Sequence, residues 1–406
     1  MIPFSPPHIT QEAIDEVVDT LKSGWITTGP KTKKFEQEIT LFCGNKATLC
    51  LNSATIGLEL VLRWYGVNKG DEVIIPAYTY CATANVIIHC GATPVMVDSN
   101  ADDFLISIDA IKNAITEKTK VIIPVDIAGL AADYNKINTI VNDQVVKDMF
   151  TPKNEVQKKL GRILVLSDAA HSFGAYYNNQ RAGTLTDITV FSFHAVKNLT
   201  TAEGGAIALN LPAPFNNSEI YKELNIMSLH GQNKDALAKT QIGNWKYDVI
   251  DAGYKGNMTD IQASLGLIDL KYYDNKTLIR RKEIFLSYNE AFSKYDWAQL
   301  PVNIDSKRVS SFHLYLLRIR NISEEQRDKI IEMIFNLKVS VNVHYLPLPS
   351  LTAYAKRGYS KDDYPVAYDN YKREISLPVF YDMDDNMINE VISAVVESVH
   401  IVLNKN

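Results

Sequence analysis

Two neighbouring stretches decide the fold of this chain: ILVLSDAAHSFGA at residues 163–175 and TVFSFHAVKNLTTAEGG at residues 189–205. Each begins with a short apolar run, which is typical of a buried strand, and continues into a turn with polar side chains. Asp168 closes the first apolar run, and Lys197 follows the second. The pattern therefore predicts an α/β unit that places a carboxylate and an amine just beyond the ends of two strands.

Similar apolar runs recur through residues 47–210 and are separated by helical patterns. They are ATLCLN, DEVIIPA, TPVMVD, TKVIIPVDI, RILVLSD, ITVFSF and GAIALN. This alternation predicts a mostly parallel sheet with helices on both faces, and such sheets bind ligands at the carboxyl ends of their strands. The residues at or beside those ends should form one rim of the sheet. They are Asn52, Pro76, Asp98, Asp126, Asp168 and Ser192.

The strand pattern is interrupted at residues 133–161, a polar, lysine-bearing stretch that we interpret as an insertion with a helix, a surface loop and a second helix. After about residue 275 the regular alternation stops. Two helical segments, a strand at HLYLLRIR, a strand at VSVNVHYL (residues 339–346) and a final amphipathic helix follow. The pattern predicts a large domain at residues 1–275 and a smaller α+β domain at residues 276–406.

The composition indicates a soluble globular protein, with 406 residues that are 46% hydrophobic and 22% charged. The net charge of −5 and the absence of a Lys/Arg block argue against nucleic acid or an anionic membrane as a partner. No window approaches the roughly 18 uninterrupted apolar residues of a spanning helix, and no leader pattern opens the chain, so we expect a cytoplasmic protein. Its four cysteines lack metal-ligand spacing and are too few for a disulfide framework, so we expect buried thiols and no metal site.

Lys197 and Asp168 together supply what a pyridoxal 5'-phosphate (PLP) enzyme needs. A lysine beside the glycines of AEGG would be partly desolvated, which lowers its pKa and favours the neutral amine that forms a Schiff base with the cofactor. A carboxylate at the end of an apolar strand needs a partner, and a protonated pyridine nitrogen is one. The alternatives are a solvated surface lysine and an aspartate that caps a helix.

Two further segments suit the same cofactor. In NSATIGLEL, Asn52, Ser53 and Thr55 lie at the predicted start of a helix, where free N–H groups and the helix dipole favour a phosphate. Ser192 can add a hydroxyl from a neighbouring strand end. Tyr80, in PAYTYCATAN, can stack on a flat heterocycle, although packing in the core is the ordinary role of a tyrosine.

The motifs DAAHSFGA, SFHAVKNLTTAEGG, PAYTYCATAN and GYKGNMTDIQASLGL occur in this order and closely resemble the DegT/StrS family of PLP-dependent sugar-nucleotide aminotransferases, nearly from end to end. The resemblance implies the PLP-dependent transferase fold of type I, with a large domain around a mostly parallel sheet and a smaller C-terminal α+β domain. It also implies that Lys197 is the Schiff-base lysine, that Asp168 pairs with the ring nitrogen and that His171 contacts the ring hydroxyl.

Further cofactor contacts are carried over from the same resemblance. It implies that Ser53, Ala54 and Thr55 cradle the phosphate together with Ser192, and that Tyr80 stacks on the ring. None of these roles follows from spacing alone.

The resemblance implies a homodimer whose active sites are completed across the interface, with the loop 253–257 reaching the partner's cofactor. Lys255 stands where many members have Asn, and GYKxN is the variant of a subset that aminates carbon 4 of UDP-linked keto sugars. Its cation would suit the cofactor phosphate or the substrate's diphosphate, with a solvated loop lysine as the alternative. Asn257, in the same loop, is expected at the substrate.

Two other segments are expected to border the sugar. Thr27 and Thr28, in WITTG, match a family segment at the mouth of the site and can bind sugar hydroxyls, with an ordinary turn as the alternative. His344, in VHYLPLPSLTAY, is a candidate contact, with a packed or capping histidine as the alternative. The chain departs from the family at Gly256, usually Tyr, and at Pro349, where a second histidine is common.

The resemblance therefore implies an aminotransferase that takes an amino group from L-glutamate and delivers it to a nucleotide-linked keto sugar. The acceptor that fits best is carbon 4 of a UDP-4-keto-6-deoxy-N-acetylhexosamine, in surface glycan biosynthesis. The alternatives are action at carbon 3 or on a dTDP-keto sugar, and a non-catalytic regulatory protein that kept the fold. The related PLP-dependent dehydratases carry histidine in place of the lysine, so the presence of Lys197 favours transamination.

Overall fold

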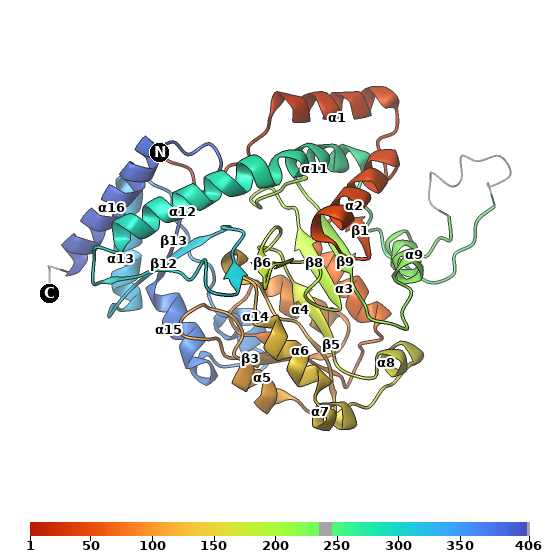
Figure 1. Ribbon diagram of the computed structural model, residues 1–406. Helices are drawn as coiled ribbons and strands as arrows, with labels where there is room; N and C mark the ends of the chain where they lie inside the picture. The colour runs from red at the N-terminus through yellow and green to blue at the C-terminus, as the bar shows by residue number, and fades with distance from the viewer. Residues whose placement is uncertain (235–245, 404–406) are drawn as a thin grey trace.

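A seven-stranded sheet forms the centre of the computed structural model, which describes residues 1–234 and 246–403 (Figure 1). The strand order is β1-β9-β8-β5-β4-β2-β3. The strands are β1 (Ala47–Leu51), β2 (Glu72–Pro76), β3 (Thr93–Val97), β4 (Thr119–Ile122), β5 (Leu164–Asp168), β8 (Ile188–Ser192) and β9 (Gly205–Leu209). They coincide with the seven predicted apolar runs. Strand β9 runs antiparallel to its neighbours β8 and β1, and the other pairs are parallel, which confirms a mostly parallel sheet.

Helices cover both faces of this sheet, as the alternation of side chains in β9 shows. Ile207 and Leu209 join the buried cluster under α3, whereas Ala206 and Ala208 join the cluster that contains Phe35 of α2. The helices that surround the sheet are α1 (Gln11–Ser23), α2 (Pro30–Cys43), α3 (Ala54–Trp64), α4 (Cys81–His89), α5 (Ile108–Ala114), α6 (Tyr134–Asn142), α7 (Gln144–Met149), α8 (Glu155–Leu160), α9 (Asn217–Ser228) and α11 (Asp260–Tyr272).

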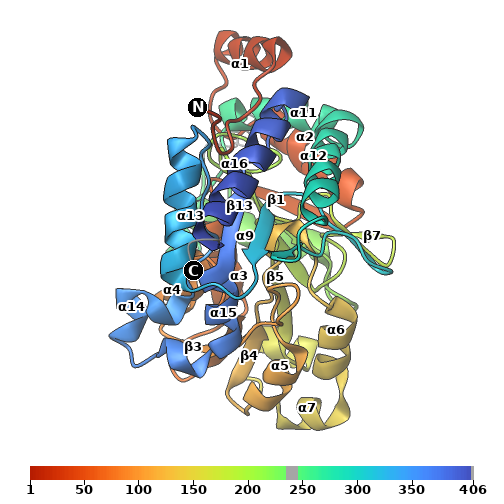
Figure 2. The ribbon, with the colours of Figure 1, turned by 90° about the vertical axis from the view of Figure 1, so that its left-hand side faces the viewer.

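A second, three-stranded sheet organises the C-terminal part of the chain, in the order β10-β12-β13. Figure 2 shows α13 and α16 beside β13, away from α5, α6 and α7. The elements here are β10 (Ala298–Gln299), β12 (Tyr315–Ile319), β13 (Glu374–Leu377), α12 (Leu278–Phe292), α13 (Glu324–Asn336), α14 (Thr352–Ala355), α15 (Pro365–Arg373) and α16 (Asp385–Leu403). Helices α12, α13 and α16 form a separate buried cluster with this sheet, whereas the buried residues of α14 and α15 join the cluster of the central sheet. The predicted domain boundary falls in the π-helical turn Tyr273–Thr277 between α11 and α12, and the division itself stays a prediction.

Short elements complete the described fold. A small sheet in the order β11-β6-β7 is formed by β6 (Tyr176–Tyr177), β7 (Gln180–Arg181) and β11 (Arg308–Val309). Three single turns of 3₁₀-helix lie at Ile127–Gly129, Leu348–Ser350 and Lys361–Asp363.

The stretch 133–161 contains three helices, one more than predicted. Each begins at a polar cap, where the side chain of Asp133, Asp143 or Asn154 accepts a hydrogen bond from the first turn of α6, α7 or α8. Asp143 has extended backbone angles, so it ends α6 and starts α7. The second cap therefore turns the expected surface loop into a short helix.

The predicted strand at residues 339–346 is wrong. This segment makes single bridges, Ile2 with Val339 and Asn342 with Ser376, and no continuous ladder. The N–H groups of Val343 and His344 bond to side chains, and that of His344 donates to the carboxylate of Glu374 at 3.0 Å. Besides β10, the strand that pairs with β12 is β13, a four-residue stretch that the apolar pattern did not indicate.

Helix α16 is, among the described residues, the helix whose length and mean hydropathy of 1.3 would allow it to cross a membrane. Its apolar pattern is interrupted by Glu390 and Glu397. Val391, Val395 and Val399 are buried in the C-terminal core, where α16 packs against α12 and α13. These contacts identify α16 as a core helix.

Candidate active site

Asp168 and Lys197 lie at the carboxyl edge of the central sheet because they follow adjacent parallel strands. Asp168 is the last residue of β5 and pairs in register with Val190 of β8. Lys197 lies in the connection between β8 and β9, where its N–H donates to the carbonyl of His194 at 2.9 Å. A hydrogen bond from the N–H of Phe193 to the carbonyl of Gly204, at 2.9 Å, closes this connection at its base.

Asp168 is a buried carboxylate with few partners. Its side chain is 6% exposed and accepts hydrogen bonds from Thr83 Oγ1 at 2.8 Å and from the N–H of Ala170 at 3.3 Å. Burial raises the pKa of Asp168 above its usual range, while these two bonds and the charge of Lys197 lower it. The carboxylate keeps lone pairs that can accept from a cationic ring nitrogen.

Lys197 is poised to react as a neutral amine. Burial lowers the pKa of its amine to about 8, and the negative charge of Asp168 opposes this shift. Within residues 1–234 and 246–403, Nζ makes no hydrogen bond or ion pair. The attraction to Asp168 therefore acts across a gap, and a free, weakly basic amine at the strand edge is what a Schiff-base lysine requires.

His171 is held as a neutral imidazole beside the two residues. Its Nδ1 accepts from the N–H of Ala128 at 3.2 Å, so the proton lies on Nε2 and faces Tyr345 Oη at 3.1 Å. Burial and the charge of Lys197 lower the pKa of His171 well below its usual range. The ring of His313 supports it at 4.5 Å between centroids. The hydroxyl of Tyr345 accepts from His171, which leaves the tyrosine proton for another acceptor.

The start of α3 forms an open anion site. Ser53 caps the helix by accepting from the N–H of Ile56 at 3.3 Å, and the N–H groups of Ala54 and Thr55 have no partner among the described residues. A side chain at Gly205 would place its Cβ 2.4 Å from the nitrogen of Ala54, so the glycine brings the backbone of β9 close to the helix start. Free N–H groups at a helix N-terminus suit a phosphate.

Ser192 and Tyr80 lie at the edges of this region. Ser192 pairs in register with Gly205, so its hydroxyl is next to the start of α3. Tyr80 immediately precedes α4 and is 58% exposed, with its ring 5.8 Å from that of Tyr345. An exposed tyrosine at the carboxyl edge, outside the core, is available to stack on a ligand. The roles of both residues stay predictions.

The loop 253–257 runs beside the start of α3 in the same chain. The N–H of Asn52 donates to the carbonyl of Gly256 at 2.8 Å, and Leu51 forms a bridge with Asn257. A Cβ at Gly256 would lie 2.9 Å from Cγ1 of Ile56, so the loop packs closely against α3 at this glycine. Lys255 is exposed, and its Nζ donates to Asn257 Oδ1 at 2.6 Å.

The two predicted sugar-binding threonines have different surroundings. Thr28 is buried, and its hydroxyl donates to the carbonyl of Met258 at 2.5 Å and accepts from Asn257 Nδ2 at 2.5 Å. Thr27 is exposed and uses its carbonyl to accept from the N–H of Asp260. Thr28 thus braces the loop that carries Lys255, and of the two hydroxyls that of Thr27 is the accessible one.

His344 lies next to Tyr345, the residue that bonds to His171, although it is far from Lys197 in the sequence. Burial, and then the charge of Lys197, lower the pKa of His344 to about 4. Nδ1 bonds to Ser376 Oγ at 2.8 Å. His344 therefore stays a candidate substrate contact.

Sequence reasoning missed two members of the site and undervalued a third. Thr83 orients Asp168, and its signal is a threonine one helical turn after Tyr80 in α4. Tyr345 bonds to His171, and its signal is its position next to His344. His313, for which sequence reasoning predicted no role in the site, lies behind His171 and bonds to Asn198 at 2.8 Å.

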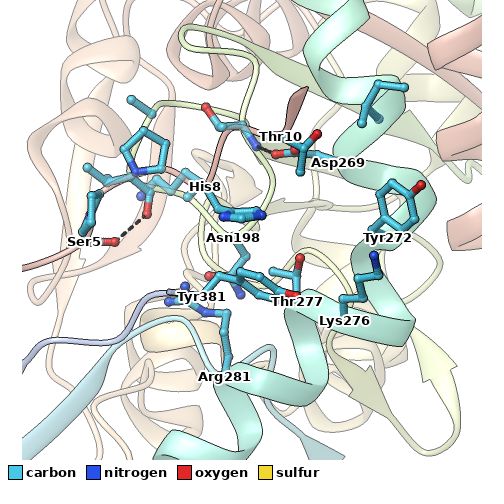
Figure 3. A pocket seen from close by; sticks show the side chains of 17 residues that line it. Ser5, His8, Thr10, Asn198, Asp269, Tyr272, Lys276, Thr277, Arg281 and Tyr381 are labelled. Atoms are coloured by element: carbon cyan, nitrogen blue, oxygen red, sulfur yellow. Dashed lines mark hydrogen bonds between the residues drawn. The ribbon is translucent and has the colours of Figure 1, made fainter. Parts of the chain in front are cut away.

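A pocket lies next to the segment that carries Lys197, and Arg281 is one of the residues that line it (Figure 3). Arg281 rises from α12 toward Asn198 and Tyr381, and donates from Nε to the carbonyl of Phe312 and from Nη2 to that of His313. Burial lowers the pKa of Arg281 to about 10. The arginine thereby fixes the segment that positions His313.

The residues present fit PLP: an open helix N-terminus for the phosphate, a buried carboxylate for the ring nitrogen and a free amine for the aldehyde. On the carboxyl edge of a mostly parallel sheet, this set defines a PLP-dependent enzyme of the transferase class.

The chain belongs to the DegT/DnrJ/EryC1/StrS aminotransferase family, whose model matches residues 7–150 and 153–396. Spr1654 of Streptococcus pneumoniae, described as a sugar aminotransferase, is 47% identical in its PMP form, with a TM-score of 0.95 over 99% of this chain and 100% of its own. Its PLP form is 46% identical, with a TM-score of 0.94 over 99% of each chain.

Two curated relatives also match along their length. An uncharacterised protein of Methanocaldococcus jannaschii is 41% identical over 97% of this chain and 96% of its own. The spore coat polysaccharide biosynthesis protein SpsC of Bacillus subtilis is 37% identical over the same shares of the two chains. Together with the site, the family and the solved structures identify a PLP-dependent sugar aminotransferase of the expected fold.

Proposed function

We propose that this enzyme transfers the amino group of L-glutamate to carbon 4 of a UDP-4-keto-6-deoxy-N-acetylhexosamine for surface glycan biosynthesis in the cytoplasm. The observation that carries the chemistry is the free Lys197 amine, with a pKa of about 8, facing the buried Asp168. The similarity to SpsC, a polysaccharide biosynthesis protein, supports a role in glycan assembly.

The choice of a UDP-linked acceptor is supported by Lys255. It replaces the usual Asn of the family loop by a cation, and its side chain is exposed. A flexible ammonium group suits a diphosphate, which presents several oxygens without one fixed geometry. The GYKxN pattern, which marks the subset of the family that acts at carbon 4, agrees with this acceptor.

The residues of the chain divide the work of the reaction. When bound, PLP withdraws electrons from the substrate carbon next to the transferred nitrogen and makes its hydrogen acidic. Lys197 as a neutral amine then takes that proton and returns it as an ammonium, which its pKa of about 8 allows in both directions near neutral pH. Asp168 would hold the ring cation, and His171, which is hydrogen-bonded to Tyr345, would contact the ring.

Absorption spectroscopy tests this proposal in one sequence of additions. The visible band of the PLP-loaded protein should fade when L-glutamate is added and return when a UDP-4-keto-6-deoxy-N-acetylhexosamine follows, and NMR of the product should place the amine on carbon 4. Recovery with a dTDP-keto sugar alone, or an amine on carbon 3, would transfer the assignment to those alternatives. A band that does not respond to any amino donor would favour a regulatory protein.

The homodimer, with loop 253–257 completing the partner's site, is part of the proposal. Mixing inactive Lys197→Ala and inactive Lys255→Ala subunits should restore one working site per heterodimer, because each site draws the two residues from different chains. Lys197→Ala mixed with itself is the control. No recovery in the mixed sample would place Lys255 in the site of its own chain.

A further inference from the structure

A hydrogen-bonded chain of three side chains leads from the C-terminal sheet to the active site. Ser376 Oγ lies 2.5 Å from Glu374 Oε1, and His344 Nδ1 lies 2.8 Å from Ser376 Oγ. The N–H of His344 donates to Glu374 Oε2 at 3.0 Å. Glu374 and Ser376 are alternate residues of β13, so both side chains point to the same face. Nε2 of His344 is the last atom of this hydrogen-bonded series and has no hydrogen-bond partner in the described part of the protein.

Glu374 is fully buried, and its carboxylate makes no ion pair within residues 1–234 and 246–403. Arg318 faces it from β12, directly opposite in register, and Arg327 faces it from α13. Nη2 of Arg318 donates to the carbonyl of Asp102, and Nη1 of Arg327 donates to the backbone carbonyls of Tyr371 and Glu374. Within the described residues, these guanidinium N–H groups donate to other oxygens, and Nε of Arg318 is buried without a hydrogen-bond partner.

The remaining groups that face the Glu374 carboxyl cannot neutralise it. Tyr78, which follows β2, donates a hydrogen bond from its hydroxyl to the carbonyl of His344. Tyr345 is the next residue after His344. Burial raises the pKa of Glu374 to about 8, against the opposing effects of the bonds from Ser376 and His344 and of the two arginines. Glu374 thus holds a proton at neutral pH and releases it in mildly alkaline solution.

His344 cannot take up that proton as a charge. Its pKa of about 4 keeps the imidazole neutral above about pH 5. A change at Glu374 can therefore alter only which ring nitrogen carries the hydrogen.

The hydrogen bonds allow two arrangements. With Glu374 protonated, its O–H donates to Ser376 Oγ, Ser376 donates to Nδ1 of His344, and the imidazole hydrogen lies on Nε2. With Glu374 ionised, Ser376 donates to the carboxylate, Nδ1 donates to Ser376, and Nε2 carries a lone pair. To pass from the first to the second, Nε2 releases one proton, Nδ1 takes the serine proton and the serine takes that of Glu374, so the net change is the loss of one proton from Nε2.

We propose that Glu374 and Ser376 are positioning residues that set the tautomer of His344, and thereby decide whether its Nε2 offers the sugar a hydrogen-bond donor or an acceptor. This inference rests on the proposed function, because it places His344 against the sugar. A keto oxygen accepts only, so the acceptor substrate pairs with the donor tautomer. KM for the keto sugar should rise about tenfold as the pH passes through about 8, since one hydrogen bond is lost.

The direct test is ¹⁵N NMR of the PLP-loaded enzyme labelled at histidine, with His344→Gln to assign the signal. In the wild-type protein the hydrogen should move from Nε2 at pH 6.5 to Nδ1 at pH 9. In Glu374→Gln the amide donates to Ser376 at every pH and should lock the hydrogen on Nε2. Ser376→Thr, which keeps the hydroxyl, should behave like the wild type, and Ser376→Ala should lose the dependence on pH.

Steady-state kinetics separate this inference from the proposed function. Glu374→Gln should show a KM for the keto sugar that stays flat between pH 6.5 and 9, with the glutamate half-reaction of each protein as the reference. Wild-type enzyme whose His344 tautomer ignores pH, or follows it equally in Glu374→Gln, would overturn the relay. A normal tautomer switch without turnover of the keto sugar would instead overturn the substrate assignment.

Discussion

Asp126 and Asp168 are two buried carboxylates that follow adjacent strands, and they differ in how many hydrogen bonds they accept. Asp126 receives hydrogen bonds from Tyr134 Oη at 2.6 Å, Ser172 Oγ at 2.6 Å and the N–H of Ala132 at 2.9 Å. Asp168 receives one side-chain bond and one long backbone bond. A carboxylate that is saturated with hydrogen bonds holds loops together. One that is unsaturated in this sense, and lies beside a free amine, is available to a ligand. Satisfaction of lone pairs, more than burial, distinguishes scaffold from site.

The largest effect should come from removing the amine that faces the unsaturated carboxylate. Lys197→Ala should lower turnover by at least about 10³-fold, because both the covalent attachment and the proton transfer are lost. The thermal unfolding temperature should stay close to that of the wild type, since Nζ makes no bond in the described fold. Turnover near the wild-type level would refute the assignment of Lys197.

Asp168→Asn should lower turnover by roughly 10²-fold or more, because the neutral amide cannot keep the ring nitrogen protonated. The amide can still accept from Thr83, so the local fold should persist. Activity assays at saturating PLP measure the effect. Wild-type turnover in this variant would mean that the unsaturated carboxylate has no part in the chemistry.

The pKa of Lys197 predicts how PLP attaches to the empty protein. Attachment needs the neutral amine, so its rate should rise roughly tenfold per pH unit up to about pH 8 and level off above that value. Stopped-flow absorbance after mixing with PLP measures the profile. A midpoint near the ordinary lysine value of about 10.4 would show that burial does not lower the pKa.

The smallest change in activity should follow from altering the saturated carboxylate. Asp126→Asn should destabilise the fold by about 1–3 kcal/mol, because an amide cannot accept all three bonds. Chemical denaturation measures this loss. Turnover of the folded variant should stay within a few-fold of wild type, and a collapse like that of Asp168→Asn would erase the distinction between the two carboxylates.

The sequence predicted the parts of the site that lie on contiguous motifs. Asp168 and Lys197 could be placed because each follows an apolar run whose direction in a parallel sheet is known. Thr83 and Tyr345 were not predicted as site residues, because their roles arise from contacts between segments that are distant in the sequence. The false strand at residues 339–346 has the same origin, since its link to β13 is one backbone bridge, Asn342 with Ser376, and one bond from the N–H of His344 to the side chain of Glu374.

The antiparallel direction of β9 also bears on how this site can be modified. Because β8 and β9 form a hairpin, the lysine-bearing connection leaves and re-enters the sheet at the same edge, closed at its base by Phe193 and Gly204. A crossover connection would have to pass around a face of the sheet, and its exchange would disturb the helices there. The hairpin lets residues 193–204 be grafted between relatives as one cassette, so that the reactive amine and its supporting turn can be exchanged while the strand order is kept.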